Sequence, residues 1–469
     1  MKRKIYFILT LIYSIINLII CYTSTIIPNK FIMPLILAYT LSLIIMYILI
    51  TRKKILPNIF GIILSIIIII INTIIIVANN EANNLLNKIT NTNKITYNYS
   101  LIVLKENNYN NIKDLNNKTI GTYYNDTDTN YNKALTKLND KLTYKEQKED
   151  NIINIINSLY KKEIDGIFIA SSYIDIIKES DKTFENKTKI IDTISIKVKV
   201  KSKEKVKTTN KGEPFILYIS GIDTYGEISS VSRSDVNIIA TINPKTGKVL
   251  LTHIPRDYYV QLRDTYGYKD KLTHAGVYGI NKSINTIEDL LDIKIDYYTR
   301  INFNSLISLI DKIGGIDVYS EISFTPHTNK KVYINQGMNH LNGEQALAFS
   351  RERYAYIEGD RHRGQNQEIV IEAIIKKLTT SNDIKTLKIL LNELDKILQT
   401  NMDKTTINNL INNQIDTNTT WTVETYNLNG FDASEYTYSY PNQKLYVMIP
   451  DETTIEEAKV KINEIKNMQ

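Results

Sequence analysis

Residues 232–257 read SRSDVNIIATINPKTGKVLLTHIPRD, and this stretch decides the expected fold of the C-terminal half. Two runs rich in β-branched residues, 236–242 and 249–254, flank the turn sequence NPKTG, a pattern typical of a β-hairpin. The run FILYIS at 215–220 predicts a further strand of the same sheet. Because strand and helix patterns alternate through the rest of this half, we predict an α/β domain whose mixed sheet is flanked by helices.

Charged residues stand at both ends of the hairpin sequence. Asp235 precedes the turn centre near Lys245 by ten residues, and Arg256 follows it by eleven. Opposed positions of an antiparallel hairpin lie at the same end, so we expect these two side chains to be neighbours. Arg233 belongs to the same end, and Asp223 joins it if the first strand runs beside the third.

Arginine and histidine are concentrated in one part of the chain. Only ten of the 57 basic residues are arginine, and the eight beyond residue 80 all lie between Arg233 and Arg363, as do all five histidines. A planar guanidinium grips phosphate or carboxylate through two hydrogen bonds, which predicts a binding site for an anion. The competing interpretation pairs these arginines with Glu352, Glu358 and Asp360 in surface salt bridges, which contribute little to stability.

Two motifs add further polar side chains to this window. LNGEQALAFSRERY predicts a helix that begins at Asn342 and has Arg351 and Arg353 at its far end. GDRHRGQNQ runs into an amphipathic stretch. If helix already begins near Arg363, then Arg363 and Gln367 are four residues apart and face the same way.

The first 80 residues differ in composition from the rest. They carry seven basic residues and no acidic one, so the net charge of +7 lies wholly in this segment. Three uncharged apolar stretches, 5–27, 31–50 and 55–78, each reach the ~20 residues that a membrane-spanning helix needs. A cleaved signal peptide is the alternative for the first stretch, but this stretch is too long and has no Ala-x-Ala site.

The distribution of basic residues predicts the orientation of the three spans. Basic residues cluster before the first span and between the second and third, whereas the first loop has only Lys30. The N-terminus is therefore expected to be cytoplasmic and the chain after the third span extracytoplasmic. The balanced charge of that part argues against a nucleic-acid binder. Cys21, the single cysteine, excludes disulfides and thiolate zinc sites.

Residues 81–200 predict a small α/β accessory domain by their alternation of strand and helix patterns. The phrases KDLNNKTIGT and YKKEIDGIFIA resemble half of an extracytoplasmic solute-binding protein. The expected strands lie at 100–104, 118–123 and 165–170, and the expected helices near 132–142 and 151–162.

Lysine occupies every second position from Lys197 to Lys207, running into the segment 201–214 that we interpret as a linker. In an extended chain, these ammonium groups lie on one face. One interpretation is a solvated edge strand or linker, because lysines discourage association between sheet edges. The other is an electrostatic track for an anionic polymer, which needs several contacts acting together at physiological ionic strength.

Several motifs in a fixed order carry a resemblance to a known family. GIDTYG, SRSDVNIIATINPKTGKVLLTHIPRD, DKLTHAGVYG, LIDKIGGIDVYS, LNGEQALAFSRER and GDRHRGQNQ occur between residue 214 and about residue 378, followed by WTVETYNLNG and KLYVMIP. Together they resemble the LytR-CpsA-Psr (LCP) family, closest in layout to streptococcal-type CpsA members with three spans and an accessory domain. The expected organisation is an anchor at 1–80, the accessory domain at 81–200, the linker at 201–214, a catalytic domain at 215–380 and its C-terminal part at 381–469.

The resemblance implies an activity and a location. The protein is expected to be a phosphotransferase that attaches an anionic glycopolymer, teichoic acid or capsular polysaccharide, to peptidoglycan. The donor would be an undecaprenyl-pyrophosphate carrier, and the location the plasma membrane of a Gram-positive bacterium. Two alternatives remain open: a polyprenyl pyrophosphatase that uses water as the acceptor, and a regulator of envelope gene expression that acts through partners, since no DNA-binding helix-turn-helix is visible in the short cytoplasmic portions.

The resemblance also implies roles for individual residues. Asp223 and Asp235 would hold Mg²⁺ or Mn²⁺, and either is a candidate for the base that deprotonates the acceptor hydroxyl. Asn366 stands where many members have arginine, so the site is expected to hold its anion with one fewer positive charge. The residues expected to hold the pyrophosphate are Arg233, Arg256, Arg351, Arg353 and Arg363, with Gln367 as a polar companion; Arg233 and Arg256 join the two aspartates as catalytic candidates.

Three features remain open to a structural interpretation. Residues 297–316 carry apolar side chains at helical spacing, which either line a slot for the polyprenyl chain or belong to the core. His253 and His274 have no second histidine at ligand spacing and no serine partner, which favours structural roles. Ser234 is interpreted as a hydrogen-bonding residue.

Overall fold

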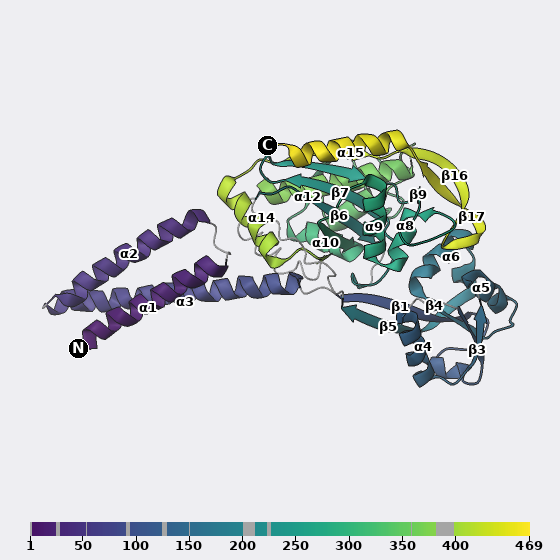
Figure 1. Ribbon diagram of the computed structural model, residues 1–469, viewed down its shortest axis with the longest axis horizontal. Helices are drawn as coiled ribbons and strands as arrows, with labels where there is room; N and C mark the ends of the chain where they lie inside the picture. Colours follow the sequence, from purple (N-terminus) through teal and green to yellow (C-terminus); the bar gives the residue numbers. More distant parts are fainter. Residues whose placement is uncertain are drawn as a thin grey trace.

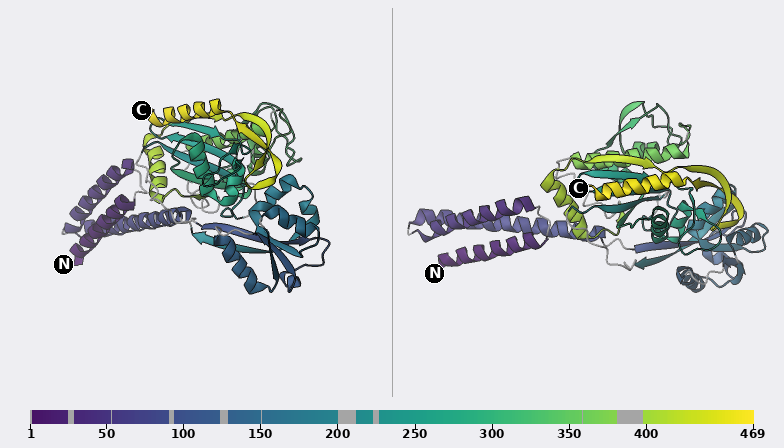
Figure 2. Two further views of the ribbon diagram at one scale, coloured as in Figure 1. Left: turned by 45° about the vertical axis from the view of Figure 1, so that its right-hand side comes forward. Right: turned by 45° about the horizontal axis from the view of Figure 1, so that its top comes forward.

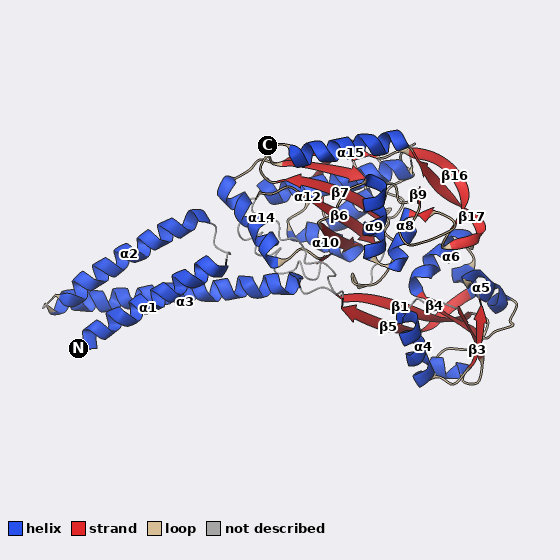
Figure 3. Cartoon of the chain, in the orientation of Figure 1, coloured by secondary structure: helices blue, strands red, loops and turns tan. Residues whose placement is uncertain are grey.

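The computed structural model describes residues 2–24, 29–52, 54–90, 94–123, 129–149, 151–199, 212–222, 227–357, 359–380 and 398–469. A bundle of long N-terminal helices projects away from two α/β parts (Figure 1). The two further views show the same separation between the bundle and the rest of the chain (Figure 2). Helices and strands are mixed in both α/β parts, as the α/β prediction requires (Figure 3).

Three N-terminal helices are long and apolar enough to cross a membrane, as predicted. Their outward side chains are mostly exposed isoleucines and leucines, which suits a lipid environment. The helices are α1 (Lys2–Ser24), α2 (Asn29–Thr51) and α3 (Ile55–Thr90).

A polar network joins these helices inside the bundle. Asn17 donates hydrogen bonds from Nδ2 to Asn72 Oδ1 at 2.5 Å and to the Tyr39 hydroxyl at 3.0 Å. The Tyr39 hydroxyl in turn donates to Asn72 Oδ1 at 2.7 Å. In lipid, hydrogen bonds between helices replace the hydrophobic drive that water supplies. These contacts therefore tie the three helices into one unit.

The accessory part is a five-stranded sheet in the order β3-β2-β4-β1-β5. Strand β1 pairs antiparallel with β4 and β5, and β2 pairs parallel with β3 and β4. Lys197 and Lys199 lie on the edge strand β5, as the edge-strand interpretation expects, whereas Lys201 to Lys207 lie outside the described residues. The elements are β1 (Lys94–Leu104), η1 (Ile112–Leu115), β2 (Thr119–Tyr123), α4 (Thr129–Lys141), β3 (Lys145–Glu149), α5 (Ile152–Tyr160), β4 (Gly166–Ala170), η2 (Ser171–Tyr173), α6 (Ile174–Ser180), α7 (Phe184–Lys187) and β5 (Thr188–Lys199).

The C-terminal part is built on a six-stranded mixed sheet in the order β14-β11-β6-β7-β8-β15, which confirms the predicted fold class. Side chains alternate between the two faces of a strand. Ile238 and Ala240 of β7 pack towards α12, whereas Ile239 joins the core formed with α9 and α15. The strands are β6 (Phe215–Ile222), β7 (Val236–Asn243), β8 (Lys248–His253), β11 (Tyr297–Asn302), β14 (Gln399–Thr400) and β15 (Thr422–Asn427).

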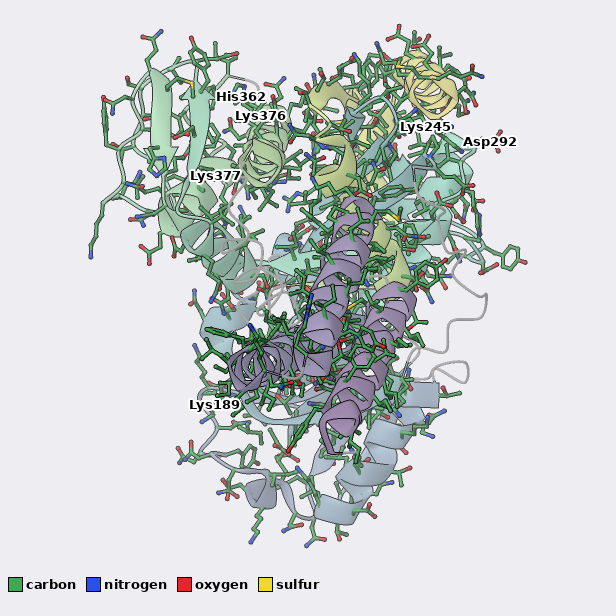
Figure 4. All side chains as sticks on the ribbon, turned by 90° about the vertical axis from the view of Figure 1, so that its left-hand side faces the viewer. Lys189, Lys245, Asp292, His362, Lys376 and Lys377 are labelled. Carbon is green, nitrogen blue, oxygen red and sulfur yellow. The ribbon has the colours of Figure 1, made fainter. Side chains whose placement is uncertain are left out.

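In a view along the bundle, the C-terminal part lies above the accessory part: Lys376 of α12 and Lys245 of the β7–β8 turn lie above Lys189 of the accessory strand β5 (Figure 4).

Further elements complete the C-terminal part. The elements are β9 (Tyr259–Val260), β10 (Asp270–Lys271), α8 (Leu272–Ala275), η3 (Gly276–Tyr278), α9 (Ile280–Leu291), α10 (Phe303–Lys312), β12 (Ile316–Ser320), β13 (Gly337–Leu341), α11 (Gly343–Ser350), α12 (Asp360–Thr380), α14 (Lys404–Thr417), β16 (Gly430–Thr437), β17 (Tyr440–Pro450) and α15 (Glu452–Asn467).

The predicted hairpin is present, but the neighbour of its first strand differs from the expectation. Strands β7 and β8 pair antiparallel, whereas β6 lies between β7 and β11 and does not run beside β8. Consecutive strands usually pair with each other, which explains this order. The end of β6 still lies beside the start of β7, because Asp235 donates from its amide to Gly221 O at 2.9 Å. Asp223 lies outside the described residues.

Helix α14 brings the C-terminal part next to the membrane helices. It packs against α2 and α3, and Lys30 at the start of α2 donates from its amide to Asp416 Oδ1 at 3.4 Å. The Lys30 ammonium also donates to the carbonyl of Ile415. The six-stranded sheet is therefore held close to the end of the bundle.

A close backbone approach positions the segment before β7. A Cβ on Gly276 would lie 2.6 Å from both Ser232 O and Ser234 N. Ser234 also donates from its amide to Thr273 O at 3.1 Å. Only glycine leaves room for η3 to lie against residues 232–234, so the DKLTHAGVYG motif helps to fix where Arg233 and Asp235 stand.

Candidate active site

A pocket with about 700 Å³ of empty space opens between the six-stranded sheet and helices α10, α11 and α12. One part of its wall is polar and includes the charged Asp235, Arg351 and Arg363 together with Asn302, Ser350 and Gln367. The rest is apolar and includes Ile219, Ile301, Phe303, Leu306, Val370 and Ile371. Such a pocket suits an amphiphilic ligand with an anionic head and a hydrocarbon chain.

Helix termini and helix spacing place the polar side chains of the pocket. Asn342 begins α11 in a capping box with Gln345, and Arg351 ends the same helix. The Arg351 guanidinium lies over the Phe303 ring, 4.2 Å from its centroid. Helix α12 begins before Arg363, so Arg363 and Gln367 are one turn apart and line the same pocket.

A second glycine allows α12 to approach the sheet. A Cβ on Gly364 would lie 2.3 Å from Cε1 of His253. His253 is buried at the end of β8, so its ring fills the space beside this glycine. This packing is consistent with the structural role expected for His253.

Asp235 is a buried carboxylate surrounded by cations. Its Oδ1 accepts hydrogen bonds from Arg256 Nη1 and Thr273 Oγ1, both at 3.0 Å. Its Oδ2 lies 3.8 Å from Arg233 Nη2. Burial alone raises the pKa of Asp235, but Arg233, Arg256 and Arg363 outweigh it and hold the pKa well below its usual range. Asp235 therefore stays ionised and is a weak base.

Ion pairs continue from Asp235 around a closed path. Arg256 Nε lies 3.5 Å from Asp257 Oδ2, and Asp257 Oδ1 lies 3.1 Å from Lys271 Nζ. Lys271 Nζ donates to Glu179 Oε2 at 2.8 Å, and Arg233 Nη1 donates to Glu179 Oε1 at 2.6 Å. We call this set of six residues the charge ring: Arg233, Asp235, Arg256, Asp257, Lys271 and Glu179.

Three members of the charge ring were not predicted from the sequence. Asp257 and Lys271 belong to the quoted motifs HIPRD and DKLTHAGVYG, so their place in the motifs was a usable signal. Glu179 lies in helix α6 of the accessory part, 54 residues before Arg233, and nothing in the local sequence points to its ion pair with Arg233. Burial raises the pKa of Glu179, but His274 and Lys271 lower it far below its usual range.

His274 lies beneath the charge ring in a structural position. It is fully buried, and its Nδ1 lies 2.6 Å from Asp270 Oδ1. Burial lowers the pKa of His274, but Asp270 and Glu179 outweigh it and raise the pKa to about 9. Its Nε2 lies 3.9 Å from Glu179 Oε2, so the imidazolium adds a cation under that carboxylate.

Other arginines of the window lie elsewhere. Arg353 follows α11 and does not line the pocket. Arg263 pairs with Asp289 at the surface, so the surface-pair interpretation holds for this arginine. Arg300 is buried and donates to Gln399 Oε1 at 3.0 Å, which ties β11 to β14. The concentration of arginine therefore reflects both the pocket and the packing around it.

The surface salt-bridge interpretation named three acidic partners for the arginines, and the structure describes the side chain of one of them, Glu352. Glu358 is not among the described residues, and neither is the side chain of Asp360. Glu352 accepts instead from the amides of His327, Tyr354 and Ala355.

Two further expectations concern the walls of the pocket. Asn366 is buried and donates to Phe349 O at 3.2 Å, so it anchors α12 to α11 and does not line the pocket. Of residues 297–316, Ile301, Phe303 and Leu306 line the pocket, whereas the two tyrosines of β11 and the end of α10 pack in the core. The stretch therefore contributes both to the pocket wall and to the core, and its role as a slot for a polyprenyl chain stays a prediction.

The fold and the pocket define an α/β protein with an arginine-containing pocket and three helices able to cross a membrane. The LytR_cpsA_psr family profile matches residues 177–463, so the chain belongs to that family, as its motifs predicted. A polyisoprenyl-teichoic acid–peptidoglycan teichoic acid transferase, TagU of Enterococcus faecalis, is 34% identical over 236 residues, which cover 50% of this chain and 72% of that protein.

Other similar proteins carry different names. Biofilm regulatory protein A of Streptococcus mutans is 35% identical over 206 residues, covering 41% of this chain and 50% of that protein. The crystal structure of TagV from B. subtilis aligns with a TM-score of 0.47 at 31% identity, covering 55% of this chain and 99% of that one.

A buried carboxyl group beside the pocket gives a pH-dependent prediction. Glu368 of α12 is only 1% exposed, and burial raises its pKa to about 8. A carboxyl with a raised pKa stabilises the fold fully below its unfolded pKa and loses that contribution as pH rises through the folded pKa. The free energy of unfolding should therefore fall between about pH 4.5 and about pH 8, by about 1.4 kcal/mol per pKa unit at most.

Glu368→Gln keeps the shape of the neutral acid and should remove this fall, so the variant should be more stable than the wild type at about pH 9. Urea unfolding of the detergent-solubilised protein across this pH range measures the effect. Glu456→Gln on the exposed face of α15, where Glu456 pairs with Lys459, is the control and should keep the wild-type slope. A wild-type slope in Glu368→Gln would contradict the assignment.

Proposed function

We propose that the protein transfers an anionic glycopolymer, as its phosphate, from a polyprenyl diphosphate carrier to peptidoglycan. The observation that carries this proposal is the pocket itself, which joins Asp235, Arg351 and Arg363 to an apolar wall. A polyprenyl diphosphate has the same division into an anionic head and a hydrocarbon chain. The name of the E. faecalis relative, a teichoic acid transferase, supports the same substrate class.

The arginines would act by holding and neutralising the diphosphate. Arg351 and Arg363 face the pocket directly, and Gln367 adds a polar side chain one turn from Arg363. Arg233 and Arg256 both contact Asp235, which lines the pocket, so their guanidinium groups lie next to the pocket wall. Guanidinium groups form strong paired hydrogen bonds to phosphate oxygens, and preorganised cations stabilise the charge that develops during phosphoryl transfer.

The reaction exchanges one phosphorus–oxygen bond for another. An acceptor hydroxyl, such as the 6-hydroxyl of N-acetylmuramic acid, attacks the phosphorus attached to the glycopolymer. The bond from that phosphorus to the bridging oxygen breaks, and the carrier leaves as polyprenyl phosphate. A loose transition state of this kind needs positioning and charge neutralisation more than a strong base. Asp235 or Asp223 would accept the hydroxyl proton, a task for which a weak base is then sufficient.

A divalent ion, Mg²⁺ or Mn²⁺, forms part of the proposal. Asp235 Oδ2 is buried and accepts no hydrogen bond from the described residues. Within the same residues no group of three or more His, Cys, Asp or Glu is arranged to hold a metal. Asp235 therefore offers one buried carboxylate oxygen to an ion whose other ligands would be waters, substrate phosphates and, by the family resemblance, Asp223, the usual kind of ligand set for Mg²⁺. When bound, the ion would supply additional neutralisation of the diphosphate.

The membrane helices fit a lipid-linked donor. Helix α14 joins the C-terminal part to α2 and α3, which keeps the pocket near the bilayer that holds the carrier. We propose that the N-terminus is cytoplasmic and that both α/β parts face the outside of a Gram-positive plasma membrane, because basic residues flank the first and third spans on one side.

Arg256→Ala should lower the rate of transfer by at least about 100-fold, as expected for loss of one preorganised donor to developing charge. The full-length protein would be incubated with an undecaprenyl-pyrophosphate-linked glycan and peptidoglycan fragments, and the products weighed by mass spectrometry. Arg263→Ala removes a surface arginine paired with Asp289 and should retain the wild-type rate.

The products of this experiment separate the alternatives. A phosphodiester-linked conjugate that disappears in Arg256→Ala supports the proposal. Release of polyprenyl phosphate without conjugate would indicate a pyrophosphatase. Absence of turnover in the wild type would favour a regulator acting through partners, in line with the name of the S. mutans relative.

Removal of divalent ions tests the metal part of the proposal. EDTA should abolish transfer by the wild type, and excess Mg²⁺ or Mn²⁺ should restore it, because phosphoryl transfer depends on neutralisation of the phosphate oxygens. The rate of conjugate formation is measured before and after each addition. Turnover that continues unchanged in EDTA would show that the arginines suffice without a metal.

A further inference from the structure

A second and larger cavity lies between the accessory sheet and the C-terminal part. It contains about 1790 Å³ of empty space. Its accessory wall includes Tyr97, Tyr123 and Tyr173, and its C-terminal wall includes Tyr278 and Tyr438. We call this cavity the tyrosine cleft. It is distinct from the arginine-containing pocket, with which it shares no lining residue.

The tyrosines form a continuous row across the two parts of the chain. The ring centroids of Tyr123 and Tyr173 are 6.4 Å apart, and those of Tyr173 and Tyr278 are 6.3 Å apart in an edge-to-face arrangement. Tyr278 and Tyr438 follow at 6.2 Å. The Tyr173 hydroxyl donates to the Tyr278 hydroxyl at 3.2 Å, and Tyr278 bonds Ser439 Oγ at 2.9 Å. The hydroxyls of Tyr173 and Tyr278 are thus engaged, and the ring of Tyr438, which is 39% exposed, is the one in the row most open to a ligand.

The rest of the cleft is polar but almost without charge. Asp264 and Lys282 are the charged residues of its wall as far as the chain is described, and their charges cancel. Amide and hydroxyl side chains supply the remaining polar groups: Asn98, Asn130, Asn151, Ser172, Thr265 and Ser439. A polyanion would find no net attraction here, in contrast to the arginine-containing pocket.

This combination suits an uncharged glycan. A pyranose ring has an apolar face of C–H groups that packs on aromatic rings, and its rim of hydroxyl and acetamido groups pairs with amides and hydroxyls. The part of this space that a ligand can fill is about 650 Å³, within the about 300–1000 Å³ of pockets for drug-sized ligands, which is room for a short oligosaccharide. Ligand sites are also common at interfaces between two domains of a chain.

The cleft leads towards the charge ring. Val231 lines the cleft and stands two residues before Arg233. Tyr278 belongs to η3, whose first residue Gly276 touches the backbone of residues 232–234. On the accessory side, Tyr173 directly precedes helix α6, and Glu179 lies near the end of that helix.

We propose that the tyrosine cleft binds the acceptor, an uncharged glycan strand of N-acetylhexosamine units, and presents one of its hydroxyls to the charge ring. The assignment rests on the proposed transferase function. The donor polymer in that function is anionic and its carrier fills the arginine-containing pocket, so the uncharged cleft matches the other substrate. The accessory sheet thereby contributes one wall of the acceptor site.

Binding of chitotetraose, an uncharged chain of four N-acetylglucosamine units, tests the proposal on the full-length protein in detergent by isothermal titration calorimetry. Tyr438→Ala removes one ring of the row, and Asn130→Ala removes one amide at a helical position where alanine is well tolerated. Each should weaken binding by about tenfold, which corresponds to about 1.4 kcal/mol and is within the range for one stacking or hydrogen-bonding contact. Tyr319→Ala is the control, because Tyr319 is 55% exposed on β12 and lies outside the cleft.

A charged chain of the same length tests the second part of the claim. Tetragalacturonate should bind the wild type at least about tenfold more weakly than chitotetraose, because the described residues of the cleft offer four carboxylates no net positive charge. Equal affinity for the two chains would overturn the assignment to an uncharged acceptor. Chitotetraose binding that is absent, or unchanged in both Tyr438→Ala and Asn130→Ala, would overturn the cleft as the site.

These outcomes are separable from failure of the transferase proposal. If the wild type fails to turn over the carrier but binds chitotetraose through the cleft, the transferase proposal fails while the glycan site stands. If the wild type transfers glycopolymer but the cleft substitutions leave chitotetraose binding unchanged, the transferase stands and the cleft inference fails.

Discussion

The burial of the Asp235 carboxylate is the constraint on which the rest of this site depends. A buried charge persists only where cations and hydrogen-bond donors surround it, and Arg233, Arg256 and Thr273 do so here. Two arginines at one sheet edge in turn require further anions. Asp257, from the same motif, supplies one carboxylate. Glu179, from helix α6 of the accessory part, supplies the other. The charge balance of the site thus joins two parts of the chain that the sequence presents as separate.

Two unlike pockets neighbour the charge ring: the wall of one includes Asp235, and the wall of the other includes Val231, two residues before Arg233. The pocket under α12 combines arginines with an apolar wall and matches a lipid-linked diphosphate. The tyrosine cleft is polar and aromatic, its described residues carry no net charge, and it matches a glycan. A group transfer needs donor and acceptor to meet at one point, and effective positioning is a large part of the rate enhancement such sites achieve. The accessory part forms one wall of the cleft and holds Arg233 through Glu179 of α6, which is how it would take part in the proposed reaction.

The sequence predicted local structure well and long-range contacts unevenly. The hairpin of β7 and β8 was predictable because its turn motif sets the register, and the register alone brings Asp235 to Arg256. The position of β6 between β7 and β11 was not predictable, since an apolar run of residues does not specify which strands pair with it. Strand β3, KEQKE, has no apolar alternation to reveal it, whereas the apolar residues of β5 do alternate and are a usable signal beside its lysines. Glu179 and the tyrosine row come from segments far apart in the chain, so only the folded structure shows that they meet.

The most direct test of this account is to locate a bound carrier. A polyprenyl diphosphate with a photoactivatable group on its chain would be cross-linked to the full-length protein, and the labelled peptides identified by mass spectrometry. The account predicts labelling of the apolar wall of the pocket, at α10 around Leu306 and at α12 around Val370, and loss of this labelling when excess unlabelled carrier competes. Competable labelling confined to α1, α2 and α3, or to the tyrosine cleft, would contradict the placement of the donor and with it the proposed chemistry of the charge ring.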